Sequence, residues 1–588
     1  DDGQIPHLVM PFGVEPNKPR LIYDARFLNL FLKTLNFTLD SVGKIPQIAW
    51  KGMFMFSIDH KSGYLHVPIH KSSWRYLGVF WKGTYYVYTC LPFGTSFSPY
   101  IYHSLTEAVA RYVRNMGIPL SVYIDDSLGG TEIVNRDAPE ALQFESANRA
   151  AYVLAMVYFS CGYFIGLPKC ELYPRWVMKY LGVLCDTANL KFWIPTDKVE
   201  KLVALIHQVL KGQFVDYGTL ESIVGKCAFL KVAIPMASLF TRVQYATLSK
   251  HEKPHKKHEL TLIPISKELR EELQIWPHLM VELQGAPWYR PTHFTLKINE
   301  DSDSSSRRYG AELIIPGEDM LVCAADFTEQ EAEAHINVKE GMALLKSTQV
   351  LTEQYPHKLK GALLHCRVDS MILLQVYNRG GSSKNLELTA ICKQLFWLQQ
   401  KFQFFLQLEH VPTKDNKADK YTREDMANDI RLREVAFHKV WNQYGPFTCD
   451  LMASPANVVK DPSSGTALPF FSRYFTSGCM GQDLLSQDIS NMTGLYCFPP
   501  LKMIGIVLQF LRESKVQCVC VLPDIKSSWY SLVLQGWQSQ MIISKPQEKG
   551  MFSVLRRNGR LRGTTFKHSM LAVNLDFSKG SSQTDAGW

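Results

Sequence analysis

The chain has 588 residues and a mass of 67.1 kDa, too much for one hydrophobic core, so we expect several domains. Its 46% hydrophobic and 20% charged residues exclude a mostly disordered, collagen-like or mucin-like chain. No apolar run reaches the roughly 18 residues of a membrane-spanning helix, and no basic segment followed by an apolar stretch opens the chain. We therefore expect neither membrane insertion nor secretion. The start without Met indicates a fragment of a longer polyprotein, although a processed terminus would look the same.

The formal net charge of +9 permits nucleic-acid binding without demonstrating it. The thirteen cysteines are scattered and form no CxxC pair, which argues against a zinc or redox site. We expect reduced, mostly buried thiols in an intracellular protein, cytoplasmic, nuclear or both.

Composition and hydrophobic periodicity divide the chain into four pieces: 1–195, 196–287, 288–428 and 429–588. The first alternates short β-rich runs with helical stretches, an α+β pattern. The second is expected to be helical, with one helix over 218–240. The third and fourth alternate strands and helices, as α/β domains do.

Three acids in the first piece carry its chemistry. Asp59 ends an apolar strand expected over 53–59, and Asp125 and Asp126 lie at the expected tip of a hairpin within 121–130. Adjacent acids after an apolar approach repel each other and are costly unless a cation lies between them. Two Mg²⁺ ions about 4 Å apart could bind a triphosphate, activate a primer 3′-hydroxyl and stabilise the leaving pyrophosphate. The alternative is a solvated pair of turn acids.

Six motifs accompany these acids in a fixed order. They are KPRLIYDARFLN (18–29), FSIDHKSGY (56–64), LPFGTSFSP (91–99), YIDD (123–126), LPKCE (167–171) and KYLGV (179–183). In this order they resemble a reverse transcriptase over about residues 5–195, with residues 196–287 as a thumb-like continuation. The resemblance implies a right-hand polymerase of fingers, palm and thumb that copies an RNA template from a DNA primer with dNTPs.

The resemblance also implies roles for single residues. Asp59, Asp125 and Asp126 would hold two Mg²⁺ ions, with Mn²⁺ as an alternative. In the nucleotide site, Lys18 and Arg20 would contact the triphosphate, and Tyr64 would be the steric gate against a ribose 2′-hydroxyl. Gly94 would lie in the loop that supports the template and nascent pair. Lys169 would be a catalytic residue, a proton donor near the pyrophosphate. Arg26 would instead anchor the fingers through a salt bridge with Asp24. The basic run 249–258 could track the primer–template backbone or be a solvated loop.

A second set of acids lies in the third piece: Asp303, Glu340 in HINVKEGMA, Asp369 in HCRVDS, and Asp419 in HVPTKDNKADKYTR. These resemble the four carboxylates with which ribonuclease H binds two metal ions and cleaves the RNA of an RNA–DNA hybrid. Asp303 is chosen because it lies seven residues before Gly310.

Parts of this second set depart from the ribonuclease H pattern. The polar run NEDSDSSSRR replaces the usual strand end, so Glu300 or Asp301 could be the ligand instead of Asp303. Lys414 stands where longer family members have a mobile catalytic histidine. A degenerate nuclease is therefore an open alternative.

No His-His-Cys-Cys zinc module or DDE-type integrase follows. Instead VWNQYGPFTCDLMASPAN (440–457), YCFPPL (496–501) and VCVLPDIKSSWY (519–530) resemble the region after ribonuclease H in DIRS-type retroelements, which is similar to a Dam-type DNA adenine methyltransferase. The resemblance implies a Rossmann-like domain, but FPPL replaces the family's DPPY-like tetrapeptide and lacks its polar and aromatic residues. We therefore expect a degenerate domain, in which Asp450 either faces an S-adenosylmethionine pocket or is an ordinary strand-end acid.

The sequence as a whole predicts an RNA-directed DNA polymerase with ribonuclease H from a DIRS-like retroelement. Its partners would be an RNA template, a DNA primer, the RNA–DNA hybrid and dNTPs, with the recombinase on another chain. The alternative is a non-catalytic, host-adopted nucleic-acid-binding relic of such an element.

Overall fold

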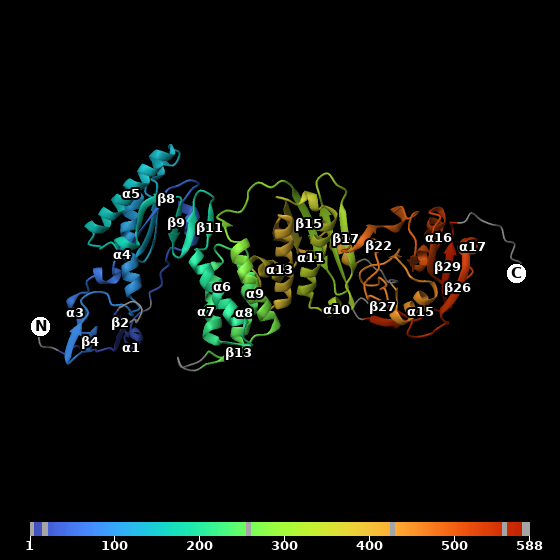
Figure 1. The fold of residues 1–588 in the computed structure, drawn as a ribbon, viewed down its shortest axis with the longest axis horizontal. Helices are drawn as coiled ribbons and strands as arrows, with labels where there is room; N and C mark the ends of the chain where they lie inside the picture. Colours follow the sequence, from blue (N-terminus) through green and yellow to red (C-terminus); the bar gives the residue numbers. More distant parts are fainter. Residues whose placement is uncertain are drawn as a thin grey trace. The chain divides into compact units, whose positions relative to one another are not determined.

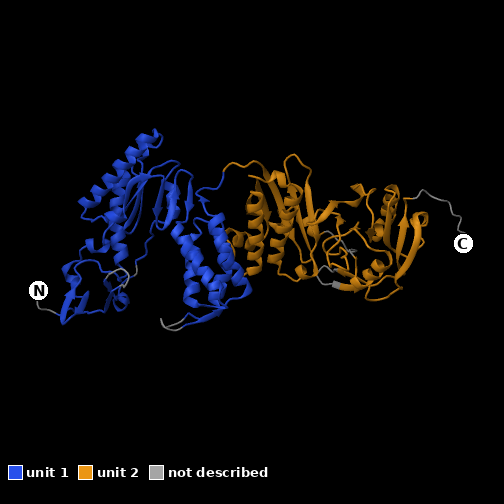
Figure 2. Ribbon diagram, in the orientation of Figure 1, with its two compact units in different colours: residues 1–291 blue, residues 292–588 orange. Residues whose placement is uncertain are grey.

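The computed structural model describes residues 5–14, 21–33, 35–253, 260–423, 430–555 and 561–578. The chain divides into two compact units, residues 1–291 and 292–588 (Figure 2). Lys18, Arg20 and the second half of the basic run 249–258 lie outside the described residues.

The first unit is organised around an antiparallel sheet in the order β6-β7-β3-β8. Figure 1 labels strand β8 of this sheet. Its strands are β3 (Met55–Asp59), β6 (Leu120–Tyr123), β7 (Asp126–Gly130) and β8 (Glu171–Arg175). Helices α4 (Ser98–Asn115) and α5 (Glu140–Ser160) share one buried core with it, including Phe56, Val122 and Leu154. Burial of this apolar face against both helices fixes where β3 and the β6–β7 hairpin end.

Smaller elements complete the part before the helical segment. They are the hairpins β1 (Phe12–Val14) with β2 (Leu21–Tyr23) and β4 (Gly78–Trp81) with β5 (Thr84–Val87), helices α1 (Arg26–Asn29), α2 (Ile45–Ile48) and α3 (Lys71–Trp74), and the sheet of β9 (Val177–Tyr180), β10 (Val183–Asp186), β11 (Lys191–Trp193) and β14 (Ala286–Pro287).

The helical segment contains α6 (Thr196–Leu210), α7 (Tyr217–Leu230), α8 (Arg242–Ser249) and α9 (Lys267–Glu282), with the short hairpin of β12 (Phe214–Asp216) and β13 (Leu262–Pro264). The single helix expected over 218–240 is wrong. α7 ends at Leu230, and Met236 has φ 54°. Pro235 disfavours helical geometry in the residue before it and has no N–H for a helical hydrogen bond, so one helix cannot continue through this segment.

The second unit begins with a five-stranded sheet in the order β17-β16-β15-β18-β19. Strands β15 (Lys297–Ser304), β16 (Arg308–Ile314) and β17 (Leu321–Asp326) are antiparallel, whereas β18 (Leu363–Val368) and β19 (Phe405–His410) run parallel to β15. The accompanying helices are α10 (Glu329–Ala332), α11 (Ile336–Gln354), α12 (Met371–Asn378), α13 (Leu386–Phe402) and α14 (Asp419–Arg423).

A seven-stranded sheet follows in the order β23-β22-β21-β24-β25-β29-β26. Figure 1 labels its strands β22, β26 and β29. It comprises β21 (Cys449–Asp450), β22 (Phe470–Ser472), β23 (Cys479–Gln482), β24 (Leu495–Cys497), β25 (Gln517–Pro523), β26 (Trp537–Ser544) and β29 (Met570–Asp576). All neighbours are parallel except those of β29. Helices α15 (Glu434–Tyr444), α16 (Ile504–Glu513) and α17 (Tyr530–Gly536) and a small sheet of β20 (Ile430–Leu432), β27 (Phe552–Leu555) and β28 (Leu561–Thr564) complete it.

All thirteen cysteines are free thiols. Within the described ranges, no helix combines the length and apolar character needed to cross a bilayer.

Candidate active sites

The first candidate site lies where β3 and β7 meet. Asp59 at the end of β3 pairs in register with Asp126 at the start of β7, and Asp125 lies in the two-residue turn between β6 and β7. Ile124 in that turn has φ 56°. A β-branched residue rarely adopts this conformation, and such strain is typical of functional sites.

Two glycines of β7 allow the close pairing with β3. A Cβ on Gly129 would lie 2.5 Å from the Phe56 ring, and one on Gly130 would lie 2.5 Å from Met53. The sequence SLGG therefore makes room for the apolar residues of the neighbouring strand, so the hairpin tip comes to lie beside Asp59.

The acids at this point repel one another. The pKa of Asp126 is raised to about 6, first by burial and then by the charges of Asp125 and Asp59, whose side chain lies within hydrogen-bonding reach. Lys169 donates to both carboxylate oxygens of Asp59, at 2.9 and 3.2 Å. A divalent cation would supply further positive charge, so these residues fit the Mg²⁺ pair that the resemblance implies.

A cavity of about 970 Å³ adjoins Asp59 and Asp126 and extends to α6 and α7. Its five lysines are Lys169, Lys179, Lys198, Lys201 and Lys226. Burial and the neighbouring charge of Lys179 lower the pKa of Lys198, while the charge of Asp197 acts in the opposite direction. The sequence analysis missed all of these except Lys169. These lysines are separated in the sequence, and only Lys198 and Lys201 lie within one helical turn of each other. Their common position beside the acids follows only from the packing of the helices.

Tyr64 lies beside the turn acids. Its ring packs 4.8 Å from Phe93 and 5.4 Å from Tyr102, and burial followed by the charge of Asp125 raises its pKa to about 12. The phenol thus stays protonated next to the carboxylates, as a rigid aromatic wall.

Gly94 holds two motifs together. At φ 119° its missing Cβ would lie 2.0 Å from the Tyr23 carbonyl oxygen, so no other residue fits. Asn29 donates to the Gly94 carbonyl at 3.0 Å and accepts from the Ser96 N–H at 2.9 Å. Gly94 also lines a second cavity of about 550 Å³. Arg26 donates to Asp24 at 2.8 and 2.6 Å, which agrees with the expected salt bridge.

The second candidate site joins three of the four expected acids of the second unit. Ligand oxygens of Asp303, Glu340 and Asp369 all lie within 4.8 Å of one another, the only such group of three in the part of the chain that the structure describes. Burial and the neighbouring acids raise the pKa of Glu340 to about 8, and burial first raises that of Asp303 to about 6. Three buried acids this close fit a divalent cation.

The fourth expected acid, Asp419, is not part of this group. It begins α14 and forms an ion pair with Arg423 at 2.7 Å, although its charge contributes to the raised pKa of Asp303. Gly310 lets α14 approach the sheet, because a Cβ there would lie 2.8 Å from Tyr421.

Glu300 and Asp301, the alternatives to Asp303, are not part of this group of acids and have other partners. Glu300 accepts from Ser347, and Arg367 donates to both oxygens of Asp301 at 2.6 and 2.5 Å. The polar run 299–308 is thus the end of β15 and its turn into β16.

Three hydroxyls missed by the sequence analysis orient the acids of the second site. Thr422 donates to Asp303 at 2.6 Å, Ser304 to Glu340 at 2.8 Å and Thr413 to Asp369 at 2.8 Å. Thr422 belongs to the ADKYTR segment that singled out Asp419, so only its role was missed. Lys414 lies in the short 3₁₀ turn Thr413–Asp415.

The order of the strands in the seven-stranded sheet reverses between the parallel strands β21 and β24. Sheets of α/β proteins usually bind ligands at such a point. Asp450 ends β21 with 2% exposure, and it accepts from the backbone N–H groups of Met452 and Val459 at 3.4 and 3.3 Å. Phe498 follows β24 and packs in a hydrophobic core, 5.9 Å from Phe552. These groups do not fit S-adenosylmethionine and a target amino group, because the acid is held by its own loop and the tetrapeptide offers no polar side chain.

Comparisons with known proteins identify the first of these regions. The family model described as reverse transcriptase (RNA-dependent DNA polymerase) matches residues 14–185. An enzymatic polyprotein of Cassava vein mosaic virus is 27% identical over 111 residues, which are 19% of this chain and 17% of the polyprotein. Residues 14–185 thus form a reverse transcriptase domain, and part of the chain is similar to a viral polyprotein.

Solved structures of a foamy viral protease–reverse transcriptase are also similar. The complex with double-stranded DNA has 17% identity over 70% of this chain and 79% of that one, at a TM-score of 0.41. The complex with an RNA/DNA hybrid has 16% identity over 87% and 66%, also at 0.41. A third structure, with double-stranded DNA, has 18% identity and a TM-score of 0.38, and the match covers 68% of this chain and 64% of that one.

Proposed function

We propose that the first unit is an RNA-directed DNA polymerase that extends a DNA primer on an RNA template with dNTPs. The observation that carries this proposal is the register pair of Asp59 and Asp126, with Asp125 in the adjacent turn and the lysine-lined cavity beside them. The match of residues 14–185 to the reverse transcriptase family supports it.

The proposed chemistry is in-line attack of the primer 3′-hydroxyl on the dNTP α-phosphate. Asp59, Asp125 and Asp126 would hold two Mg²⁺ ions, or Mn²⁺, which supply Lewis-acid stabilisation of the attacking and leaving oxygens. Lys169 lies within reach of Asp59 and would give a proton to the leaving pyrophosphate. Tyr64 would exclude a ribose 2′-hydroxyl, Gly94 would support the templating pair, and Lys18 and Arg20 would contact the triphosphate.

Primer extension tests this proposal. The full chain with poly(rA), oligo(dT), Mg²⁺ and dTTP should extend the primer, and Asp125→Asn/Asp126→Asn should lower the rate by at least about a thousandfold without weakening template binding. Asp137→Asn is a matched control, because it makes the same substitution at an exposed acid that does not line the cavity. Binding without extension by the wild type would leave the alternative of a non-catalytic relic.

We further propose that the second unit cleaves the RNA strand of RNA–DNA hybrids. The cluster of Asp303, Glu340 and Asp369 carries this proposal, with Asp419 as a fourth ligand that would leave Arg423 when a cation binds. The chain's own hydroxyls on Thr422 and Ser304 would hold two of the carboxylates in place. A labelled hybrid should be cut in Mg²⁺, and Glu340→Gln should abolish the cutting while Glu333→Gln, an exposed acid nearby, should not.

We infer a DIRS-like element whose recombinase is on another chain, with residues 429–588 as a degenerate methyltransferase-like domain. Phe498 in the FPPL tetrapeptide packs against a hydrophobic core, which supports degeneracy. S-adenosylmethionine should therefore give no calorimetric binding signal with the full chain.

The free thiols support an intracellular location, cytoplasmic, nuclear or both.

A further inference from the structure

The hairpin of β4 and β5 exposes four aromatic side chains that the proposed chemistry does not use. Phe80, Trp81, Tyr85 and Tyr86 are 48%, 52%, 46% and 52% exposed. Aromatic side chains normally bury most of their surface, and a group of exposed ones marks an interaction site.

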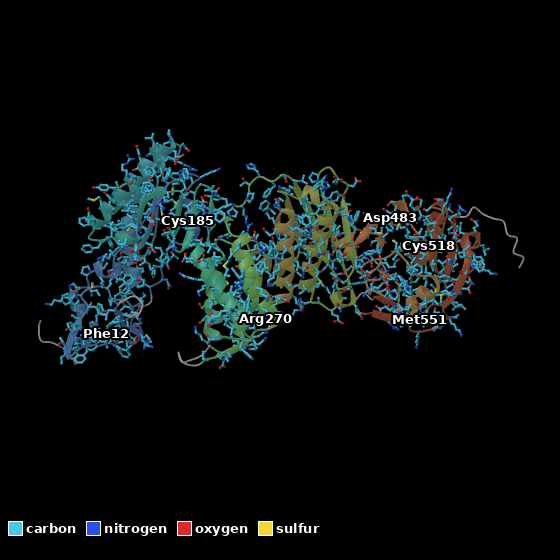
Figure 3. The ribbon with its side chains drawn as sticks, in the orientation of Figure 1. Phe12, Cys185, Arg270, Asp483, Cys518 and Met551 are labelled. Atoms are coloured by element: carbon cyan, nitrogen blue, oxygen red, sulfur yellow. The ribbon has the colours of Figure 1, made fainter. Side chains whose placement is uncertain are left out.

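Both faces of the hairpin carry these rings. Phe80 pairs in register with Tyr85, and their rings lie 4.8 Å apart on one face. Trp81 and Tyr86 lie on the other face, where Trp81 packs 5.5 Å from Phe12, labelled in Figure 3. An antiparallel strand pair usually buries one face against the core. At this hairpin only the base does so, because Val79 is buried and the tip is not.

The segment of sequence that includes the hairpin carries charge of one sign. From His60 to Thr106 the sequence contains no Asp or Glu, whereas it contains Lys61, Lys71, Arg75 and Lys82. A run of 47 residues without an acid favours a polyanionic partner over a protein surface of mixed charge.

The hairpin tip is built to hold its shape. Lys82 and Gly83 have φ 47° and 82°, the backbone signs of a type I′ turn, which matches the twist of the strands. The Lys82 ammonium lies 5.7 Å from the Trp81 ring centroid. A cation is thus fixed next to an exposed ring, the pairing that single-stranded nucleic acids recognise through phosphate and base.

We propose that the β4–β5 hairpin binds unpaired bases of a single-stranded nucleic acid by stacking them on Trp81 and Tyr86, which share one face, with Lys82 at a phosphate. Naming that strand as the unpaired template rests on the proposed polymerase activity, whereas the binding itself does not. Stacking on a ring tolerates every base, so the hairpin would hold any template sequence.

Binding of the full chain to labelled 12-mers tests this proposal. We expect Trp81→Ala and Tyr86→Ala each to weaken binding of oligo(U) and oligo(dT) by at least about fivefold. An abasic 12-mer with the same phosphates should bind equally to all three proteins. Oligo(U) and oligo(dT) separate RNA from DNA preference. Tyr152→Ala on α5 is the matched control, because Tyr152 is 68% exposed and lies outside the hairpin.

Lys82→Asn tests the phosphate contact separately. Asn-Gly is the preferred pair for a type I′ turn, so the hairpin should remain folded. The slope of log affinity against log salt should fall by about 0.7 for single strands, as expected for one lost phosphate contact.

Three results would overturn the proposal: unchanged oligo(U) and oligo(dT) binding in both ring variants, an equal loss for the abasic strand, or a change of sedimentation coefficient showing that the rings join two copies of this chain. Primer extension at saturating primer–template keeps the two proposals apart. An active polymerase whose ring variants bind normally contradicts only the stacking proposal, and an inactive wild type whose ring variants bind weakly contradicts only the polymerase.

Discussion

Gly94 is the residue where backbone geometry leaves least freedom. Its φ of 119° combines with a Tyr23 carbonyl oxygen 2.0 Å from any added Cβ. We expect Gly94→Ala to lower the free energy of unfolding by more than about 3 kcal/mol, because backbone rather than a side chain must move. Urea unfolding measures the change.

Gly52→Ala is the control for the Gly94 prediction. Gly52 also has a positive φ, 81°, but a Cβ there would meet nothing within 4 Å. Only the cost of left-handed geometry remains, about 1 kcal/mol. Equal losses for the two variants would show that the close approach to Tyr23 carries no energy.

Glu300 is a buried acid with no role as a ligand in the proposed site. Burial first raises its pKa to about 7 from 4.5. The folded chain therefore keeps the proton between these pH values while the unfolded chain loses it, so the contribution of Glu300 to stability is highest below pH 4.5 and falls as the pH rises to about 7. Glu300→Gln keeps an acceptor for Ser347 and removes this loss.

We expect Glu300→Gln to raise the free energy of unfolding by about 2 kcal/mol at pH 8 and to change it little at pH 4.5. Thermal unfolding of wild type and variant across this range measures the difference. A gain of the same size at both pH values would mean that the carboxylate's titration is not its cause.

Among the elements, those whose sequence alternates clearly were predictable and those fixed by distant packing were not. The strand expected over 53–59 is β3, and the expected hairpin with Asp125 at its tip is β6–β7, because apolar runs and glycines encode them locally. The strand β15 was not predictable, because residues 300–304 are polar yet buried. Their partners, Arg367, Ser347 and Thr422, come from elements far along the chain, and a single sequence does not pair them.

The helices α6 and α9 are joined by one guanidinium. Arg270 on α9, labelled in Figure 3, donates to the carbonyl oxygens of Leu210 and Gly212 at 2.7 and 2.8 Å, where α6 ends. Carbonyls at a helix end lack intrahelical partners, and a cation there also interacts favourably with the helix dipole.

Arg270→Met should lower the free energy of unfolding by about 2 kcal/mol, because it leaves these carbonyls without a charged donor. Lys267→Met on the same helix is the control, since Lys267 is exposed and 4.0 Å from Glu271; its loss should stay below about 0.5 kcal/mol. Urea unfolding of both variants decides, and similar losses would remove the argument for an end cap.

At the scale of the molecule, the two proposed activities lie in different compact units. Asp59, Asp125 and Asp126 belong to residues 1–291, and Asp303, Glu340 and Asp369 belong to residues 292–588. The sequence could propose both sets because each acid lies in its own local motif. It could not show that Asp419 stands apart with Arg423, since that depends on side-chain geometry.

Separate units predict separable activities in the full chain. Asp126→Asn should abolish primer extension and leave hybrid cleavage within about twofold, and Glu340→Gln should do the reverse, because each substitution alters the charge of one carboxylate cluster only. The double variant should lose both activities and still bind the hybrid, because neither substitution removes a basic side chain that would contact its phosphates. Extension and cleavage are measured on the same preparations, with a preformed hybrid so that cleavage does not depend on synthesis. If Asp126→Asn also removed cleavage of the preformed hybrid, the two sites would share a metal-dependent step, and assigning one reaction to each unit would be wrong.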